Sequence, residues 1–320
     1  MQRGPLAEPT YRPQFSGHET FPLRYGWLKK AYDAIEASAG QTENKNIFLG
    51  DDAIARFGVG KNMVAAMRHW ATTCNIIGDL QSTGHISTTP LGKKLFSSKG
   101  LDPFMEHPAT LWLIHWQLAA YSQKTTWFWA FNHYPALTFD RDQLIRALEK
   151  ITKEENWARV SASTIKNDVA CFVRTYVAHD ASGKNNSDDA LESPLTELGL
   201  IKQVGKRDGF RFVRGAKPNL GGGVFVYALV NFWLIFSKSS TLSFEAIAHE
   251  PGSPGRVFLL DENDLADRLA DLDLLTNGVL RWSETAGLKQ VVRSQDLTQE
   301  FSLQFVEMDY HTATAERGSK

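Results

Sequence analysis

The sequence has few of the features that mark several large classes of protein. Its only cysteines, Cys74 and Cys171, cannot build a disulfide framework or a cysteine-based zinc site, and they suit a reducing compartment. Its longest apolar run, residues 224–236, is interrupted by Asn231 and is shorter than the roughly 20 residues that a membrane-spanning helix needs. The chain also lacks a start of the signal-peptide type. We therefore expect a cytoplasmic protein that has no membrane segment.

An excess of charge of either sign is missing as well. The 320 residues include 35 Lys and Arg and 36 Asp and Glu, which gives a net charge of −1 at pH 7. A protein that binds nucleic acid through a basic surface over its whole length is excluded, so any phosphate-binding surface must be local. Hydrophobic residues make up 42% of the chain and charged residues 22%, which is enough to bury the cores of two or three domains.

The sequence predicts a mainly α-helical protein with small β-hairpins, of the α+β class. Pro5, Pro9 and Pro13 break up the start of the chain, and the polar, glycine- and serine-rich stretch 180–190 interrupts it again. The predicted organisation is a flexible arm (1–14), a winged helix-turn-helix DNA-binding domain (15–100), an aromatic-rich helical domain (101–180), a basic hairpin or wing (181–223), a helical C-terminal domain (224–310) and a frayed tail (311–320).

Residues 50–96 have the outline of a winged helix-turn-helix. Residues 51–57 can form a helix capped by an aspartate, and the glycines of residues 58–60 allow a tight turn. A second helix starts at Lys61, and a hairpin is expected over residues 80–89.

The second of these helices divides into two faces. Met63, Met67, Trp70 and Cys74 follow one another at helical spacing, which places them on one buried face. The opposite face is cationic and has small or hydroxyl side chains, as a recognition helix needs in the major groove of DNA. Many winged helices bind protein instead, so both kinds of partner stay open. The candidate DNA-binding residues here are Lys61, Asn62, Arg68, His69 and Thr72, together with Lys93 and Lys94 after the hairpin.

A second winged module is an option further along the chain. The helix predicted over residues 161–177 is similar in layout to the first recognition helix, with Lys166 and Arg174 directed outward. A strongly basic hairpin is predicted to turn at residues 207–209, because Asp-Gly favours such a turn. An ordinary solvated hairpin is the competing interpretation. The candidate DNA-binding residues are Lys206, Arg207 and Arg211, and Arg256 in a later tight turn is a further candidate.

Residues 101–135 are rich in tryptophan and phenylalanine. The apolar residues around these rings predict a packed core between domains. A stacking surface for unpaired bases is the less favoured alternative, because it needs exposed rings. His115 and His133 share the apolar setting, so we expect structural roles for both. A further helix is predicted from Phe139.

No complete catalytic motif is present. Gly60-Lys61 ends like a nucleotide-binding P-loop, but Ala55 stands where the first glycine is needed and Asn62 where a hydroxyl residue is needed. One histidine–glutamate pair near the N-terminus, followed closely by an arginine, is explained neither as core nor as a helix cap. The candidate catalytic residues are therefore His18, Glu19 and Arg24.

Four long motifs, in the same order, resemble those of a bacterial family. They read FSGHETFPLRYGWLKKAYDAI, GVGKNMVAAMRHW, GLDPFMEHPATLWLIHWQLA and TTWFWAFNHY. The likeness continues through STIKNDVACFVRTYV and SPGRVFLLDE, so that it covers most of residues 15–295. The family is the SspB-like family, formerly of unknown function, whose genes lie beside sulfur-transfer genes in DNA phosphorothioation islands.

The resemblance implies a DNA-nicking role in the Ssp system, which places single-strand phosphorothioates in DNA as part of bacterial defence. The chain would be an endonuclease that opens one strand, with a divalent metal (Mg or Mn) and no organic cofactor. The implied partners are DNA, a cysteine desulfurase, an ATPase and a PAPS-reductase-like enzyme, without a membrane. Two alternatives stay open: a non-catalytic winged-helix adaptor that recruits the sulfur-transfer enzymes to DNA, and a protein-interaction scaffold.

Overall fold

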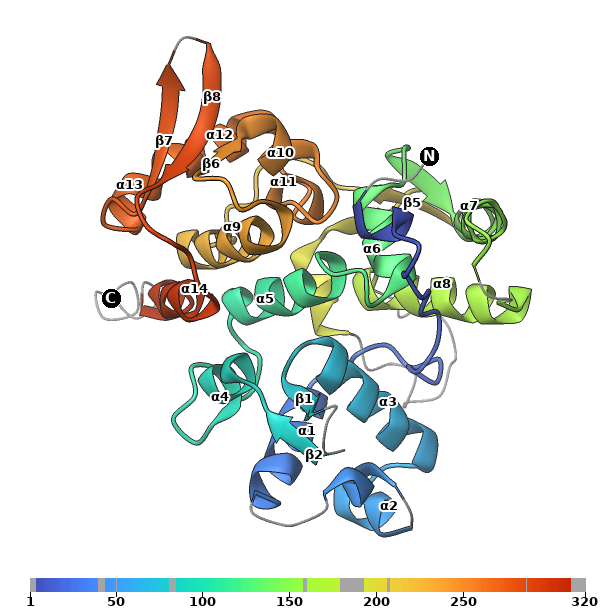
Figure 1. Ribbon diagram of the computed structural model, residues 1–320. Helices are drawn as coiled ribbons and strands as arrows, with labels where there is room; N and C mark the ends of the chain where they lie inside the picture. Colours follow the sequence, from blue (N-terminus) through green and yellow to red (C-terminus); the bar gives the residue numbers. More distant parts are fainter. Residues whose placement is uncertain are drawn as a thin grey trace.

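Three units, each made of helices and a β-hairpin, follow one another along the chain (Figure 1). The computed structural model describes residues 4–39, 44–49, 51–80, 85–157, 160–178, 193–205, 208–285 and 287–311. We name the units the first module (27–88), the second module (125–212) and the third module (222–293). The α+β class predicted from the sequence is confirmed, because the sheets are small and antiparallel and helices predominate.

The first module has the arrangement predicted for residues 50–96. Its elements are α1 (Trp27–Ala37), η2 (Lys45–Phe48), α2 (Asp51–Phe57), α3 (Lys61–Thr73), β1 (Ile77–Leu80) and β2 (His85–Thr88). α3 packs on α1 and α2, and β1 pairs with β2. The turn before α3 uses Gly58 at a φ of 66°, a left-handed conformation that favours glycine. On α3, Met67 and Trp70 are fully buried whereas Lys61 is exposed, as the helical spacing predicts.

One side chain in the first module takes the place of a strand. The buried amide of Asn44 donates to the carbonyl of Ile86 at 2.6 Å and accepts the Ile86 N–H at 2.8 Å. These are the two bonds that a neighbouring antiparallel strand would make with one residue of β2. Asn44 therefore completes the two-stranded sheet on its open side.

Asn44→Asp is expected to destabilise the chain more than Asn44→Ala. Alanine loses both bonds, which costs about 1–3 kcal/mol. Aspartate keeps the bond from the Ile86 N–H but buries a charge against the Ile86 carbonyl, which costs several kcal/mol. Denaturant unfolding measures both losses, and Asn46→Asp at an exposed position of the same segment is the control. A smaller loss for aspartate than for alanine would contradict the strand-like role.

The second module repeats this order with a complete sheet. Its elements are α6 (Thr125–Asn132), β3 (Thr138–Asp140), α7 (Arg141–Glu154), α8 (Ala162–Tyr176), η3 (Pro194–Leu198), β4 (Ile201–Gln203) and β5 (Gly209–Phe212). β5 lies between β3 and β4, and α8 packs on α6 and α7. Helix, strand, two helices and a hairpin, joined in this way, make a winged helix. The second winged module is thus present, and residues from both 101–180 and 181–223 build it.

The start of α7 differs from the sequence prediction. A helix from Phe139 is expected, but Phe139 lies in β3, paired with Phe210, and the helix begins two residues later at Arg141. The reason is a capping box. The Asp140 side chain accepts the Gln143 N–H at 2.6 Å, while the Gln143 side chain accepts the Asp140 N–H at 3.0 Å. This reciprocal cap fixes the first turn of α7 and leaves Phe139 extended.

The third module has the same topology again. Its elements are α9 (Gly222–Phe236), β6 (Thr241–Ser243), α10 (Phe244–His249), α11 (Pro254–Val257), α12 (Glu262–Ala270), α13 (Leu272–Leu275), β7 (Leu280–Thr285) and β8 (Leu288–Arg293). β8 lies between β6 and β7. The apolar run 224–236 forms most of α9 and is largely buried. In the part of the chain that the structure describes, every helix is too short or too polar to cross a membrane.

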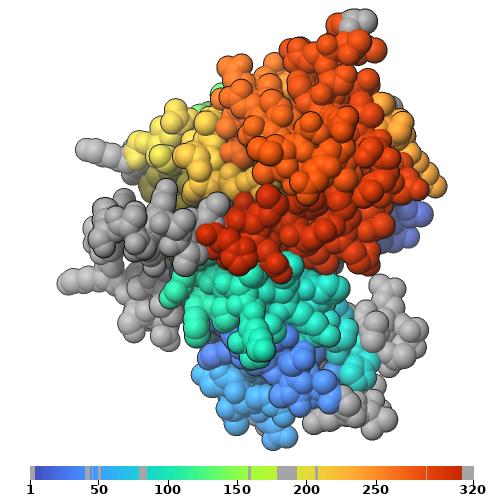
Figure 2. All heavy atoms as spheres, turned by 90° about the vertical axis from the view of Figure 1, so that its left-hand side faces the viewer, coloured from blue at the N-terminus to red at the C-terminus, as the bar shows by residue number. Residues whose placement is uncertain are grey.

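Helices outside the modules tie the modules together. They are η1 (Gly4–Ala7), α4 (Pro90–Phe96), α5 (Pro108–Ala119) and α14 (Gln299–Phe305). α14 packs on α9, and the residues that follow it reach α4 and α5. The Lys94 Nζ lies 2.7 Å from Glu307 Oε1, and the Thr110 hydroxyl lies 2.7 Å from the Tyr310 hydroxyl. Figure 2 shows the red C-terminal segment lying against the teal segment before α5.

The aromatic window 101–135 is a packed core, as predicted. Trp112, Trp116 and Trp127 are fully buried, so their rings are not available to stack on bases. His115 lies among them and has a structural role. Its Nε2 donates to the Val257 carbonyl at 2.8 Å, and its Nδ1 accepts the Tyr176 hydroxyl at 2.8 Å. These bonds satisfy both nitrogens of a neutral imidazole and join α5 to α8 and α11.

Candidate functional site

The loop of residues 17–21 lies between α3 and α8, the third helices of the first two modules. From α3, the Trp70 indole N–H donates to the Phe21 carbonyl at 3.0 Å. From α8, the Cys171 thiol contacts the same oxygen at 3.4 Å, and Arg174 donates to another carbonyl of the loop. The loop therefore connects α3 to α8 and fixes their relative position (Figure 1).

Beneath the loop lies a buried charge cluster, which we define as His18, His69, Lys124 and Asp168. The His18 Nε2 lies 2.7 Å from Asp168 Oδ1, and the Lys124 Nζ lies 3.3 Å from the same oxygen. These three side chains are 3%, 1% and 0% exposed for His18, Lys124 and Asp168. The rings of His18 and His69 lie edge to face, with centres 6.2 Å apart. The cluster thus joins the loop to α3, to α8 and to the cap residue of α6.

Hydrogen bonds place the ring proton of His18, while burial and neighbouring charges shift the pKa values of Asp168 and His69. The Thr20 N–H donates to His18 Nδ1 at 3.0 Å, so the proton of this imidazole is on Nε2 and is donated to Asp168. Burial alone raises the pKa of Asp168, but Lys124 and then His18 outweigh burial and hold this pKa below its ordinary value. Burial, followed by Lys124 and His18, lowers the pKa of His69 to about 3. At neutral pH the buried Lys124–Asp168 ion pair therefore lies beside the neutral imidazole of His69.

The backbone of the 17–21 loop is strained. Gly17 has a φ of 100°, and a Cβ at this position would lie 2.4 Å from His69 Nδ1, so a side chain does not fit. Glu19 and Thr20 follow at φ values of 47° and 66°. This left-handed conformation costs a non-glycine residue about 1–2 kcal/mol. Strain of this kind persists where surrounding contacts impose it, and it gathers at functional sites. The loop is therefore the candidate functional site.

The three candidate catalytic residues take different positions around the loop. Glu19 is exposed, whereas His18 is directed inward to Asp168. Arg24 is buried, with its guanidinium 5.4 Å from the centre of the Phe21 ring and 5.6 Å from that of a tryptophan ring. Lys124 and Asp168, which join His18 in the structure, are not among the residues that the sequence predicts for the site. Of these two residues, Asp168 is the easier to identify as a candidate from the sequence, because it is a carboxylate beside the apolar face of a predicted helix.

On α3 the candidate DNA-binding residues divide between the outer and inner faces. Lys61, Asn62 and Thr72 are exposed, and Arg68 is half-buried. His69 is also half-buried, but its ring packs edge-on against Trp70, with centres 5.4 Å apart, so it belongs to the buried charge cluster. α3 contains no acidic residue, so its outer face is cationic and polar.

The other candidate residues lie on several surfaces. Lys94 is engaged by Glu307, and Arg174 donates to the carbonyl of Thr20. Both groups therefore have partners within the chain. Exposed side chains are found at Lys93, Lys166 and Arg211. The residues Lys206 and Arg207 lie outside the described part of the chain.

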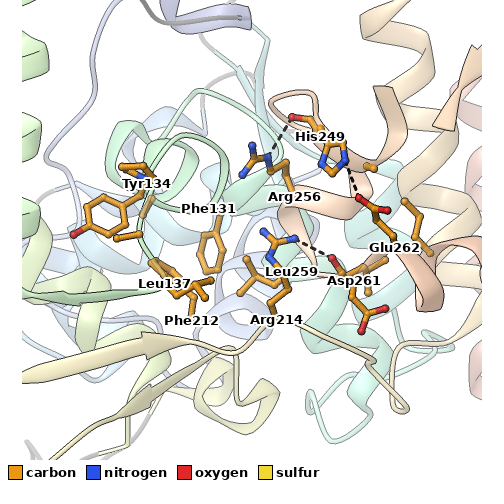
Figure 3. Close-up of a pocket in the computed structure, with 16 residues that line it drawn as sticks. Phe131, Tyr134, Leu137, Phe212, Arg214, His249, Arg256, Leu259, Asp261 and Glu262 are labelled. Carbon is orange, nitrogen blue, oxygen red and sulfur yellow. Dashed lines mark hydrogen bonds and ion pairs between the residues drawn. The ribbon is translucent and has the colours of Figure 1, made fainter. Parts of the chain in front are cut away.

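Arg256 lines a pocket of about 380 Å³ between the second and third modules (Figure 3). Its Nε donates to the His249 carbonyl at 3.2 Å, and Arg214 lies on the same side of the pocket. Asp261 and Glu262 line this side as well, and the His249 Nε2 lies 3.4 Å from Glu262 Oε1. Carboxylates and guanidinium groups thus share the wall, so an anion would meet both signs of charge here. The outer face of α3 suits a phosphate better.

The buried charge cluster does not fit a divalent metal ion. Its carboxylate, Asp168, already has the Lys124 ammonium beside it, and that ammonium supplies the charge that a metal would bring. Over the described ranges, no three side chains of His, Cys, Asp or Glu come together in a way that could hold a metal ion.

Comparison with known proteins places this geometry in a family. A family model described as a protein of unknown function (DUF4007) matches residues 15–310. A crystal structure of magnesium ion-bound SspB is similar with a TM-score of 0.83 and 28% identity, over 97% of this chain and 91% of that chain. Another SspB crystal structure gives a TM-score of 0.80 and 29% identity, over 96% and 91%. No curated protein matches the sequence. The chain, SspB-like in structure over nearly its whole length, belongs to the DUF4007 family.

Proposed function

We propose that this protein is a DNA-binding component of an Ssp-type phosphorothioation system and that it nicks duplex DNA. The observation that supports the proposal is the similarity to SspB over 97% of the chain at 28% identity. The proposed partners are a cysteine desulfurase, an ATPase and a PAPS-reductase-like enzyme, which would exchange sulfur for oxygen at the opened strand.

The outer face of α3 is the proposed contact with DNA. Lys61 and Arg68 supply cations for phosphates, and the small side chain of Ala65 lies exposed between them. Thr72 adds a hydroxyl group at the end of the same face. Because the net charge of the whole chain is −1, this local surface, and not the average charge, determines binding.

Glu19 is the proposed catalytic residue. It is the exposed member of the candidate set, and it lies on the strained 17–21 loop beside α3. In hydrolysis of a phosphodiester, water attacks phosphorus, the bond from phosphorus to the leaving oxygen breaks, and the proton of the water must be accepted by a base. An exposed carboxylate can accept that proton.

Glu19→Gln is expected to slow nicking about 100-fold, because the amide cannot accept the proton. The measurement is conversion of supercoiled plasmid to the open circle, with Mg or Mn in the buffer. Glu8→Gln, a second exposed glutamate near the N-terminus, is the matched control and should leave the rate unchanged. A wild-type protein that binds the plasmid but never nicks it would rule out catalysis by this chain.

Burial of His18 favours a second candidate function, a non-catalytic adaptor. The one histidine of the candidate set is 3% exposed and is bonded to Asp168, so it supports the loop from within. An adaptor would bind DNA with the same outer face of α3 and recruit the sulfur-transfer enzymes. The plasmid experiment separates the two candidates, because an adaptor produces no open circles.

A further inference from the structure

The first and second modules carry the same short sequence pattern on their third helix. Residues 61–67 of α3 read KNMVAAM, and residues 166–172 of α8 read KNDVACF. Lysine, asparagine, valine and alanine coincide in position, and the last residue is large and apolar in both. No residue of α12, the corresponding helix of the third module, is a lysine.

Matching positions of the pattern have the same burial on both helices. The valine and the last residue are fully buried in both, whereas the lysine and the asparagine are exposed in both. The two helices thus present the same pair of side chains, Lys61 with Asn62 and Lys166 with Asn167, to the outside. A lysine binds a phosphate, and an asparagine can pair with the edge of an adenine.

The third position of the pattern differs between the two helices. The residue found there in α8, Asp168, connects the second module to the 17–21 loop. Met63 of α3 is half-buried, whereas Asp168 of α8 is fully buried and bonded to His18 of the 17–21 loop. The same loop accepts bonds from both helices. In Figure 1, α3 and α8 both begin on the right-hand side of the view, and the blue N-terminal segment passes between them. Lys61 and Asn62 are the first two residues of α3, and Lys166 and Asn167 lie in the second turn of α8.

The charges on these two helices fit a polyanion, and those on the corresponding helix of the third module do not. α3 has no carboxylate, and the one carboxylate of α8, Asp168, is buried beside Lys124. α12 instead exposes Glu262 and Asp267. Charge complementarity thus favours the first and second modules over the third as a surface for a polyanion such as DNA.

We infer that α3 and α8 form one composite interface that grips a single DNA duplex at two places. Lys61 and Asn62 contact one segment of the duplex, and Lys166 and Asn167 contact another. The 17–21 loop, with exposed Glu19, faces the phosphates between the two contacts. The inference rests on the proposed DNA binding, and it adds the second module, the orientation of the duplex and the place of the loop.

The test measures affinity for a duplex of about 24 base pairs as a function of salt, by fluorescence anisotropy, for the full chain. Lys61→Ala and Lys166→Ala should each weaken binding roughly eightfold at 0.1 M salt, because each lost phosphate contact lowers the salt slope by about 0.9. The double variant should lower the slope by about twice that amount. Lys289→Ala, an exposed lysine on β8 of the third module, removes the same charge and should have no effect.

The outcomes separate this inference from the proposed function. If Lys61→Ala weakens binding and Lys166→Ala does not, the composite interface is wrong while DNA binding by the first module stands. Binding of two duplexes by each chain, measured by titration at high concentration, would also overturn the composite interface. A wild-type chain with no affinity for DNA would overturn both proposals. Far-ultraviolet circular dichroism of each variant confirms that a change in affinity is not a loss of folding.

Discussion

Lys124→Met is expected to lower the free energy of unfolding by about 3–5 kcal/mol, because it leaves the carboxylate of Asp168 buried without its cation. Methionine has a similar length, so the loss is of charge more than of volume. The Lys124 ammonium also lies 5.2 Å from the centre of the Trp127 ring and donates to the Ser16 carbonyl at 3.3 Å. Denaturant unfolding at pH 7 measures the loss.

Two further variants make this result specific to the buried pair. Lys124→Met combined with Asp168→Asn removes both charges, keeps an acceptor for His18 and should recover more than half of the loss. Lys29→Met breaks a partly exposed pair with Asp33 on α1 and should cost less than about 1 kcal/mol. Equal losses for Lys124→Met and Lys29→Met would show that burial of the Lys124–Asp168 pair is energetically unimportant.

Stability is expected to fall steeply as the pH drops from about 6.5 to about 4. Burial lowers the pKa of His115 to about 4, and that of His69 to about 3. In the unfolded chain both imidazoles have a pKa of about 6.5 and take up protons below that pH, whereas in the folded chain they stay neutral. The stabilisation is therefore fully present above pH 6.5 and is lost progressively as the pH falls. Each imidazole contributes roughly 1.4 kcal/mol per pH unit, which makes roughly 2.7 kcal/mol per unit for both.

His115→Gln provides the matched comparison for this pH dependence. Glutamine can still donate to the Val257 carbonyl, so part of the local structure is kept, but it takes up no proton. The slope of the unfolding free energy against pH between 6 and 4.5 should therefore fall by about half. A variant with the slope of the wild type would show that His115 does not cause the acid sensitivity.

The sequence predicts those helices and hairpins that are determined by residues close together in the chain. The helix α3 follows from the spacing of Met67 and Trp70, and its outer face from Lys61 and Thr72, because a helix exposed on one side shows its period directly. The hairpin of β4 and β5 follows in the same way from an Asp-Gly turn signal. The strand β3 has only three residues and is fixed by pairing with β5, so it gives no periodic signal of its own.

The candidate site is harder to predict from the sequence because its contacts join distant parts of the chain. His18 and Asp168 are 150 residues apart in sequence, and the sequence identifies the histidine without its partners. Lys124 lies in a sequence segment rich in aromatic residues. The sequence does not show why a lysine is buried there, because the reason is its ion pair with Asp168. The repeated pattern of α3 and α8 is present in the sequence, but its importance depends on the equal burial that the structure shows.

The 17–21 loop contacts both α3 and α8, and for the proposed composite interface this would have a consequence for sequence preference on DNA. Two contact points on a rigid support would not follow the groove, so the duplex would have to adjust its twist and bend to reach both. The cost of that adjustment depends on base steps that the protein does not touch, being lowest at flexible pyrimidine–purine steps. With both helices on one duplex, the steps lying beneath the loop would be selected by their deformability, before any base edge is read.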